Sequence, residues 1–136
     1  MDIESYLRPH RKPLLIAAEQ AVDQASDKLP DKTQLNRLIS ICSEASCAEE
    51  ITSYLRYQAS RRTRPWPEVF AKEVIKKIEP PLETLTLALP TVSDTDRDRV
   101  RVAAWRLYAV FLTRAFTYAD QVRRNNRGQD HDRARR

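Results

Sequence analysis

The sequence predicts an all-α protein, a single-domain bundle of five to six helices that ends in a long C-terminal helix. Its 136 residues are enough for one domain to bury a sizeable core without disulfides or metals. The chain has one glycine, which disfavours hairpin turns and phosphate-binding loops, because both need backbone conformations that glycine adopts most cheaply. Its eight prolines fall mostly between stretches with apolar residues at helical spacing, where they end helices.

Residues 1–30 are expected to form an N-terminal helical segment of this domain. A short helix over 2–8 should end at Pro9 and Pro13, because proline lacks the N–H that a helix interior needs. Apolar residues then recur at i, i+3 and i+4 spacing, which predicts a longer helix over 14–25.

The bundle core is expected within residues 31–125, where two helices carry capping signals. Asp31 is followed three residues later by Gln34, and Ser46 by Glu49. In a capping box, the first side chain accepts a hydrogen bond from the fourth backbone N–H, and the fourth side chain reaches back in return. Each pair therefore predicts the start of a helix.

Prolines divide the next part of the chain. Pro67 suits the first turn of a helix whose apolar residues continue at helical spacing as far as Glu79. Pro80 and Pro81 follow directly and should break this helix. A separate short helix is therefore expected over residues 82–89.

The longest helix is predicted near the C-terminal end. Ser93 or Asp94 can cap it, and apolar residues cover a broad arc of it as far as Asn125. Residues 126–136 show no periodicity and are expected to be a disordered basic tail. The core should be enclosed by four helices. These are the helices that begin after Asp31, after Ser46 and at Pro67, together with the last helix.

Positive charge is concentrated in two parts of the chain. The formal net charge is +5, but residues 97–136 hold eleven arginines against four aspartates. Such a concentration attracts polyanions, because neutralising phosphates releases their counterions. A second basic segment contains Arg56, Arg61, Arg62, Arg64, Lys72, Lys76 and Lys77, with only Glu68 and Glu73 opposing them.

Two aromatic residues in the second segment have alternative interpretations. Trp66 could stack on a nucleobase, but plugging the corner between two helices is the commoner arrangement. Tyr57 and Arg61 are one helical turn apart, so they could face a ligand or pack as a half-buried structural pair.

No convergent set of catalytic groups is evident. His10 lies between prolines and His131 lies in the tail, without nucleophile or carboxylate partners. Cys42 and Cys47 are too few for a disulfide framework, and their spacing does not match a zinc site. We therefore expect two buried thiols. Glu49 is expected to cap a helix, so it does not indicate a catalytic carboxylate. The expectation is a protein that is not an enzyme and holds no metal or cofactor.

The sequence also lacks the marks of a membrane protein. Its first residues show no signal-peptide pattern, and no apolar run approaches the roughly 18 residues of a membrane span. We expect a cytoplasmic protein with no membrane partner.

Several segments together resemble one protein family over residues 31–122. Its signature at the start of one helix and the end of the next matches Thr33, Gln34, Leu35, Arg37, Leu55, Tyr57, Ala59 and Arg61. Further matches are Phe70, Phe111, Phe116, Tyr118 and Ala119. The chain resembles the small helical subunit of type III-A (Csm-type) CRISPR–Cas effector complexes, or the equivalent subunit of another type III complex.

This resemblance implies a non-catalytic protein, present in several copies within a ribonucleoprotein of antiviral defence. Family members contact the backbone of the guide RNA–target RNA duplex without reading bases. They bridge the large polymerase-like subunit, the backbone subunits and each other, so self-association, including a homodimer, is part of the expectation.

The basic side chains form the expected RNA site. A-form RNA is contacted mainly through phosphates and 2′-hydroxyls, which calls for arginine and lysine on a rigid helical surface. The predicted RNA-binding residues are Arg37, Arg56, Arg61, Arg62, Arg64, Lys72, Lys76, Arg99, Arg106 and Arg124.

Two other functions fit a basic helical protein. One is an adaptor whose basic surface binds an acidic protein. The other is a helix-turn-helix DNA regulator that uses the two helices joined near Ala45. Glu49 and Glu50 argue against the DNA-binding function, because carboxylates in the first turn of a recognition helix repel phosphate.

Overall fold

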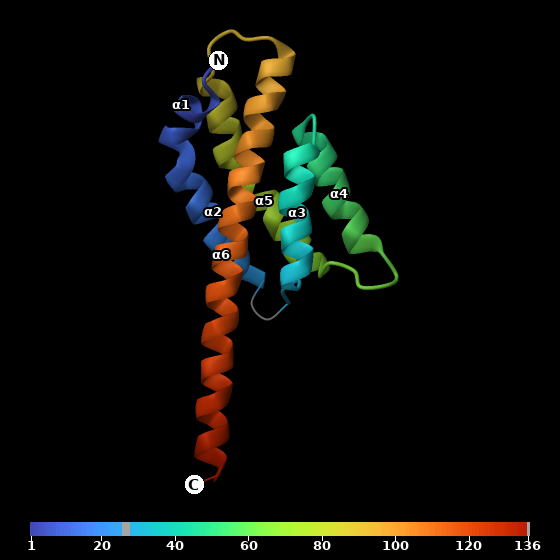
Figure 1. Ribbon diagram of the computed structural model, residues 1–136, viewed down its shortest axis with the longest axis vertical. Helices are drawn as coiled ribbons and strands as arrows, with labels where there is room; N and C mark the ends of the chain where they lie inside the picture. The colour runs from blue at the N-terminus through green and yellow to red at the C-terminus, as the bar shows by residue number, and fades with distance from the viewer. Residues whose placement is uncertain (26–27, 136) are drawn as a thin grey trace.

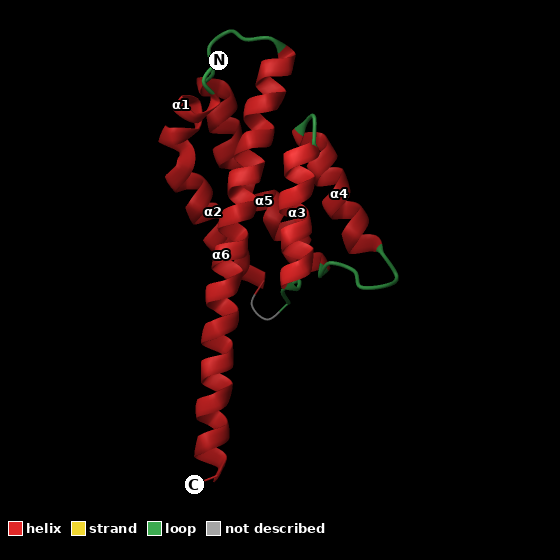
Figure 2. Cartoon of the chain, in the orientation of Figure 1, coloured by secondary structure: helices red, strands yellow, loops and turns green. Residues whose placement is uncertain are grey.

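A computed structural model describes the backbone of residues 1–25 and 28–135, and the side chains of these residues as far as residue 128. Within these residues the chain folds into six α-helices and one 3₁₀ turn. No strand occurs in these residues (Figure 2), and the prediction of an all-α bundle with a long last helix is confirmed. The elements are α1 (Ile3–Leu7), η1 (Arg8–His10), α2 (Arg11–Ala25), α3 (Lys32–Glu44), α4 (Ala48–Ser60), α5 (Glu68–Ala88) and α6 (Asp94–Arg135).

Helix α6 is the axis of the molecule. Helices α2 and α3 pack on it, and α2 also packs on α5 (Figure 1). Helix α4 packs on α5 and α6. The C-terminal half of α6 continues well past the end of the bundle as a single helix. This arrangement leaves one face of that half without a neighbour.

The core includes the N-terminal segment, contrary to expectation. Leu14, Ala18 and Ala21 of α2 have no exposed surface, and they pack in one cluster with Trp105 and Tyr108 of α6. Alanine on α2 allows close approach of the helices. The prediction that the helices after residue 30 alone enclose the core is therefore wrong.

Two of the predicted helix starts are confirmed. The Asp31 Oδ1 accepts from the Gln34 N–H at 2.7 Å, and the Gln34 Oε1 accepts from the Asp31 N–H at 3.0 Å, which completes a capping box. Of the two candidates for α6, Ser93 is the cap, since its Oγ accepts from the N–H of Asp96 at 3.1 Å.

The predicted Ser46–Glu49 box is wrong by one residue. Cys47 is the N-cap of α4 and its side chain makes no capping bond to the helix. The carboxylate of Glu50 lies at the third helical position and accepts from the N–H of Ser46 at 3.2 Å. Glu49 is thereby left free to contact another helix.

Helix α5 runs through Pro80 and Pro81, so the predicted break and the separate helix over 82–89 are wrong. Val74, Ile78, Leu82 and Leu85 form one buried face on both sides of the prolines. Pro80 is exposed, so water can reach the backbone carbonyls that lose their donors. Burial of the continuous face outweighs the local cost of the prolines.

The short first helix ends where it was predicted, because α1 ends at Leu7 and the 3₁₀ turn η1 follows. Pro9 lies in η1, and Pro13 lies in the first turn of α2, where a missing N–H leaves no bond unmade. Pro13 therefore does not end a helix, and α2 begins at Arg11, before the predicted start at residue 14.

Helix α6 ends at Arg135, beyond the expected end at Asn125. No proline interrupts this stretch, and its arginine, glutamine and alanine residues have good helix propensity. Side chains from residue 129 onward lie outside the described residues. None of the helices in the described part of the chain combines the length and apolarity needed to cross a lipid bilayer.

Candidate nucleic-acid interface

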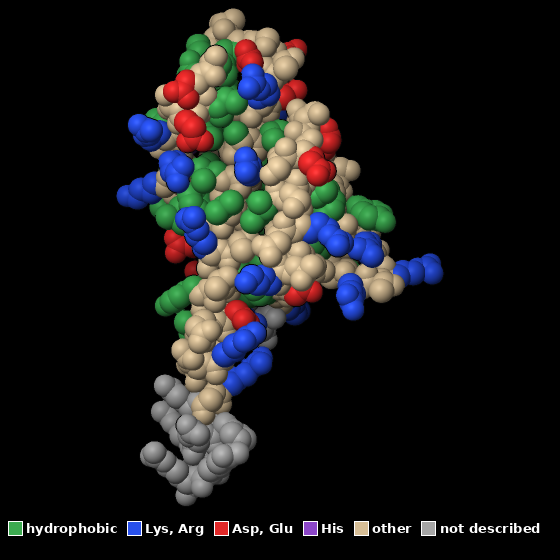
Figure 3. Space-filling view, viewed as in Figure 1, with side chains coloured by type: hydrophobic (Ala, Val, Ile, Leu, Met, Phe, Trp, Pro, Cys, Tyr) green, Lys and Arg blue, Asp and Glu red, His purple; other side chains and the backbone are tan. Residues whose placement is uncertain are grey.

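Four of the predicted RNA-binding residues gather at one end of the bundle. Arg37 is on α3, Arg61 follows α4, and Arg62 and Arg64 lie in the loop that leads to α5. We call these four residues the end patch, and Figure 3 shows the basic side chains gathered where α4 ends. None of the four forms an ion pair with a carboxylate of the described residues.

The loop that carries this patch is fixed at three points. The Gln34 side chain donates from Nε2 to the Arg64 carbonyl oxygen at 3.1 Å, and the Trp66 N–H donates to the Gln58 carbonyl oxygen at 3.0 Å. The Trp66 ring is 1% exposed and stacks on Phe70, with 5.7 Å between ring centroids. Trp66 is therefore the corner plug of the two interpretations, and it is not available to stack on a nucleobase.

The backbone of Arg64 has φ of 48°, in the left-handed region that residues other than glycine seldom adopt. Such a conformation costs on the order of 1 kcal/mol and persists where surrounding contacts impose it. Here the hydrogen bond from Gln34 to the Arg64 carbonyl oxygen and the burial of Trp66 two residues later hold Arg64 in this conformation.

Arg61 contacts Gln58 and not Tyr57. Its Nη1 donates to the Gln58 Oε1 at 3.1 Å, while the Tyr57 side chain is 63% exposed. The structural pair proposed for Tyr57 and Arg61 is therefore absent from the described contacts. Burial raises the pKa of the Tyr54 hydroxyl, and the nearby charges of Arg37 and Arg61 oppose that rise. Arg37 and Arg61 thus lie near the same hydroxyl group.

Three other predicted residues border a groove between α4 and α5. Arg56 comes from α4, and Lys72 and Lys76 come from α5. Glu68 and Glu79 border the same groove, and Lys72 forms an exposed ion pair of 3.0 Å with Glu68. The mixed charge of this groove makes it a weaker anion site than the end patch.

The last three predicted residues, which we call the α6 stripe, lie along α6. Arg99 pairs with Asp96 at 3.5 Å and Arg124 with Asp120 at 3.1 Å, whereas Arg106 has no ion pair within the described chain. No hydrogen bond or ion pair among the described residues joins the stripe to the end patch. The ten predicted residues therefore divide into three groups.

No protein-family model, curated protein or solved structure matches this chain. Among the described residues, the end patch is the only one of the three groups in which no member forms an ion pair with a carboxylate.

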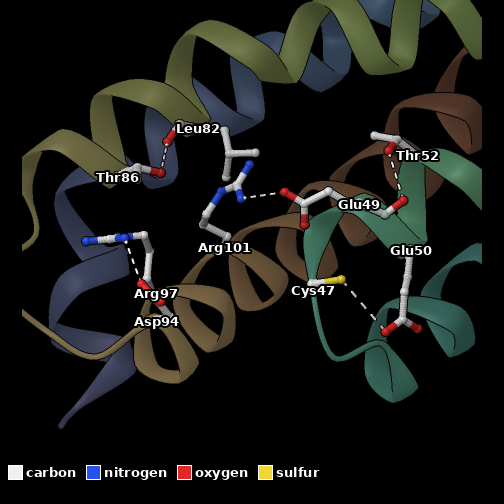
Figure 4. Close-up of polar contacts among 9 residues, drawn as sticks. All are labelled: Cys47, Glu49, Glu50, Thr52, Leu82, Thr86, Asp94, Arg97 and Arg101. Carbon is white, nitrogen blue, oxygen red and sulfur yellow. Dashed lines mark hydrogen bonds and ion pairs between the residues drawn. The ribbon is translucent and has the colours of Figure 1, made fainter.

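The carboxylate of Glu49 contacts Arg101, a residue that sequence analysis did not single out. The Arg101 Nη1 donates to the Glu49 Oε1 at 3.0 Å and joins α6 to α4 (Figure 4). The backbone N–H of Glu49 and this guanidinium lower the pKa of the Glu49 carboxyl group. An acidic residue at the first turn of α4 facing an arginine 52 positions away carries no local sequence signal.

The two cysteines differ in their surroundings. Cys42 is free and buried, and burial raises the pKa of its thiol to about 12, which disfavours the nucleophilic thiolate. Cys47 is free but only half-buried, so the expectation of two buried thiols is wrong for it. Within the part of the chain whose side chains are described, no three His, Cys, Asp or Glu residues converge to hold a metal ion.

Proposed function

We propose that this chain is a non-catalytic RNA-binding protein, the small subunit of a type III CRISPR effector ribonucleoprotein in the cytoplasm. It binds the backbone of the guide RNA–target RNA duplex without sequence specificity. It bridges the large polymerase-like subunit and its other neighbours in antiviral defence, and it associates with further copies of itself.

The observation that carries this proposal is the end patch. Four arginines lie on a loop and the adjoining helices, and neighbouring carboxylates of the described chain do not neutralise them. Guanidinium groups bind phosphate oxygens through charge-assisted and often bidentate hydrogen bonds. The fixed loop limits the entropy that the arginines would lose on binding.

The burial of Trp66 favours backbone contact over base recognition. Sequence-specific RNA recognition commonly uses aromatic platforms on which splayed bases stack. The tryptophan nearest to the end patch has 1% of its surface exposed, so it offers no such platform. With its tryptophan buried, the arginine patch suits the phosphates of an A-form duplex.

The two segments that carry the family resemblance also meet at this end. Gln34 belongs to the first segment and bonds to Arg64, just beyond the second. Arg37 and Arg61, one from each segment, lie near the Tyr54 hydroxyl. The convergence of the signature residues on the basic patch supports a shared role in RNA binding.

The proposal is tested by charge reversal. The double variant Arg61→Glu/Arg62→Glu should bind an A-form RNA duplex more weakly. The slope of its log affinity against log salt concentration should decrease by the equivalent of about two phosphate contacts. The matched control, Arg8→Glu/Lys12→Glu, makes the same charge change at exposed positions near the N-terminus. Fluorescence anisotropy of labelled RNA across a salt series measures both.

An unchanged slope in the Arg61/Arg62 variant would remove the end patch from the RNA site. Protein that purifies free of nucleic acid and does not bind the duplex would favour the adaptor function. A repeat array and a gene for a polymerase-like CRISPR subunit beside the coding sequence would support the assignment to a type III complex.

A further inference from the structure

An apolar groove lies between α2 and the C-terminal part of α6. Its apolar lining comes from Leu15 and Val22 of α2 and from Phe111, Ala115, Tyr118 and Val122 of α6. Tyr118 is 74% exposed and Val122 is 38% exposed. Apolar side chains are visible on this edge of the molecule above the tail (Figure 3). Large apolar side chains grouped on one face indicate a binding surface rather than isolated exposed residues.

The exposed residues continue the pattern that packs the core. Tyr108, Phe111, Ala115, Tyr118 and Val122 follow one another at alternating intervals of three and four residues, the spacing of a coiled-coil seam. Tyr108 and Phe111 are buried within the bundle, whereas Tyr118 and Val122 are exposed in the groove beside α2. The same seam is therefore covered by the chain's own helices in one half and uncovered in the other.

The charges along the groove narrow the choice of partner. Glu19 and Asp23 border it on α2, and neither forms an ion pair with a described residue. Arg114 and Arg123 border it on α6, and the Arg114 guanidinium lies 5.9 Å from the Phe111 ring centroid. The acidic residues on α2 disfavour RNA as the occupant of the groove. They instead suit an apolar helix that carries basic residues beside its apolar face. Helix α6 is itself such a helix.

We propose that a second copy of this chain covers the groove, with the two α6 helices antiparallel and related by a two-fold axis. Each α6 would lie in the groove of the other chain, and α2 and α6 of both chains would form a four-helix seam. In this arrangement Glu19 and Asp23 of one chain face the arginine-bearing flank of the other α6. A parallel pair would instead bring Arg123, Arg124 and Arg127 of both chains together. The dimer rests on the self-association in the proposed function and assigns a surface to it. Because this surface contains no residue of the end patch, loss of the dimer and loss of RNA binding can be distinguished.

Sedimentation equilibrium of nuclease-treated full-length protein in 0.5 M salt (about a 4 Å screening length) tests the dimer. The wild type should show twice the chain mass of 15.8 kDa. The variant Tyr118→Glu/Val122→Glu should be monomeric with unchanged helical circular dichroism, because both residues are exposed in the single chain. The matched control Val69→Glu/Leu87→Glu also replaces two exposed apolar residues, on α5, and should remain dimeric.

A second experiment tests the antiparallel orientation. Gly128 has open space around its α-carbon, so Gly128→Cys is tolerated. In an antiparallel pair the two thiols introduced by this substitution are far apart, and they should not cross-link under oxidation. Efficient cross-linking between them would overturn the antiparallel arrangement. A monomeric wild type, or a dimer that survives Tyr118→Glu/Val122→Glu, would overturn the proposed surface altogether.

Discussion

The side-chain amide of Gln34 donates a hydrogen bond of 3.1 Å to the backbone carbonyl oxygen of Arg64, while its Oε1 accepts from the N–H of Asp31 at 3.0 Å. One side chain therefore caps α3 and fixes the loop of the end patch. These two roles use different atoms of the amide, so substitution can separate them.

Gln34→Ala should remove both contacts and lower the free energy of unfolding by about 1 kcal/mol. Amide hydrogen exchange in residues 61–66 should become faster, and RNA affinity should fall because the arginines lose their fixed support. Gln34→Glu keeps the acceptor for the Asp31 N–H but loses the donor to Arg64. It should therefore accelerate exchange in the loop while α3 remains protected. Equal protection of the loop in all three proteins would contradict this role for Gln34.

Tyr108→Phe should lower the free energy of unfolding by about 1–2 kcal/mol. The Tyr108 hydroxyl is buried and donates to the Val74 carbonyl oxygen at 2.7 Å, so the variant keeps the ring but loses this bond between α6 and α5. Urea denaturation measures the difference. Tyr57→Phe is the control, because that side chain is largely exposed and its loss of a hydroxyl should change stability little. Equal effects of the two variants would disprove the role of the buried bond.

Pro81→Ala should raise the free energy of unfolding by about 1–3 kcal/mol, because alanine restores a helical N–H and relieves the ring's clash with the preceding turn. Pro90→Ala provides the contrast. Pro90 lies between α5 and α6, so its replacement mainly increases the freedom of the unfolded chain and should destabilise by about 0.5–1 kcal/mol. Thermal denaturation distinguishes the signs. A loss of stability in Pro81→Ala would show that α5 depends on a proline-induced shape.

Alkaline pH should destabilise the protein partly through Cys42. Burial raises the pKa of this thiol from 9.0 to about 12, so its stabilising effect is complete below pH 9.0 and is lost as pH rises toward 12. In Cys42→Val, the fall of unfolding free energy with pH in this range should be shallower by up to about 1.4 kcal/mol per pH unit. Urea denaturation at several pH values measures the slope. Identical slopes would show that the thiol has the same pKa in the folded and unfolded proteins and would contradict the effect of its burial.

Local signals predicted the parts of the candidate site but not their grouping. The excess of arginine and the Asp31–Gln34 box are readable from neighbouring residues, and the structure contains that box. The division of the basic residues into the end patch, the α4–α5 groove and the α6 stripe depends on which helices are adjacent. The Glu49–Arg101 pair joins residues 52 positions apart, so no local spacing could indicate it.

The sequence alone determined the all-helical class, the long last helix and two of the helix caps, because these follow from one glycine and from short-range periodicity and hydrogen bonding. Tertiary structure decided that α5 passes through two prolines, that α2 belongs to the core and that Trp66 is buried. The physical reason is the relative size of the effects. Interrupting a helix with proline costs about 3 kcal/mol, whereas each large apolar side chain buried contributes about 1.5–3 kcal/mol, and several such side chains share one helix face.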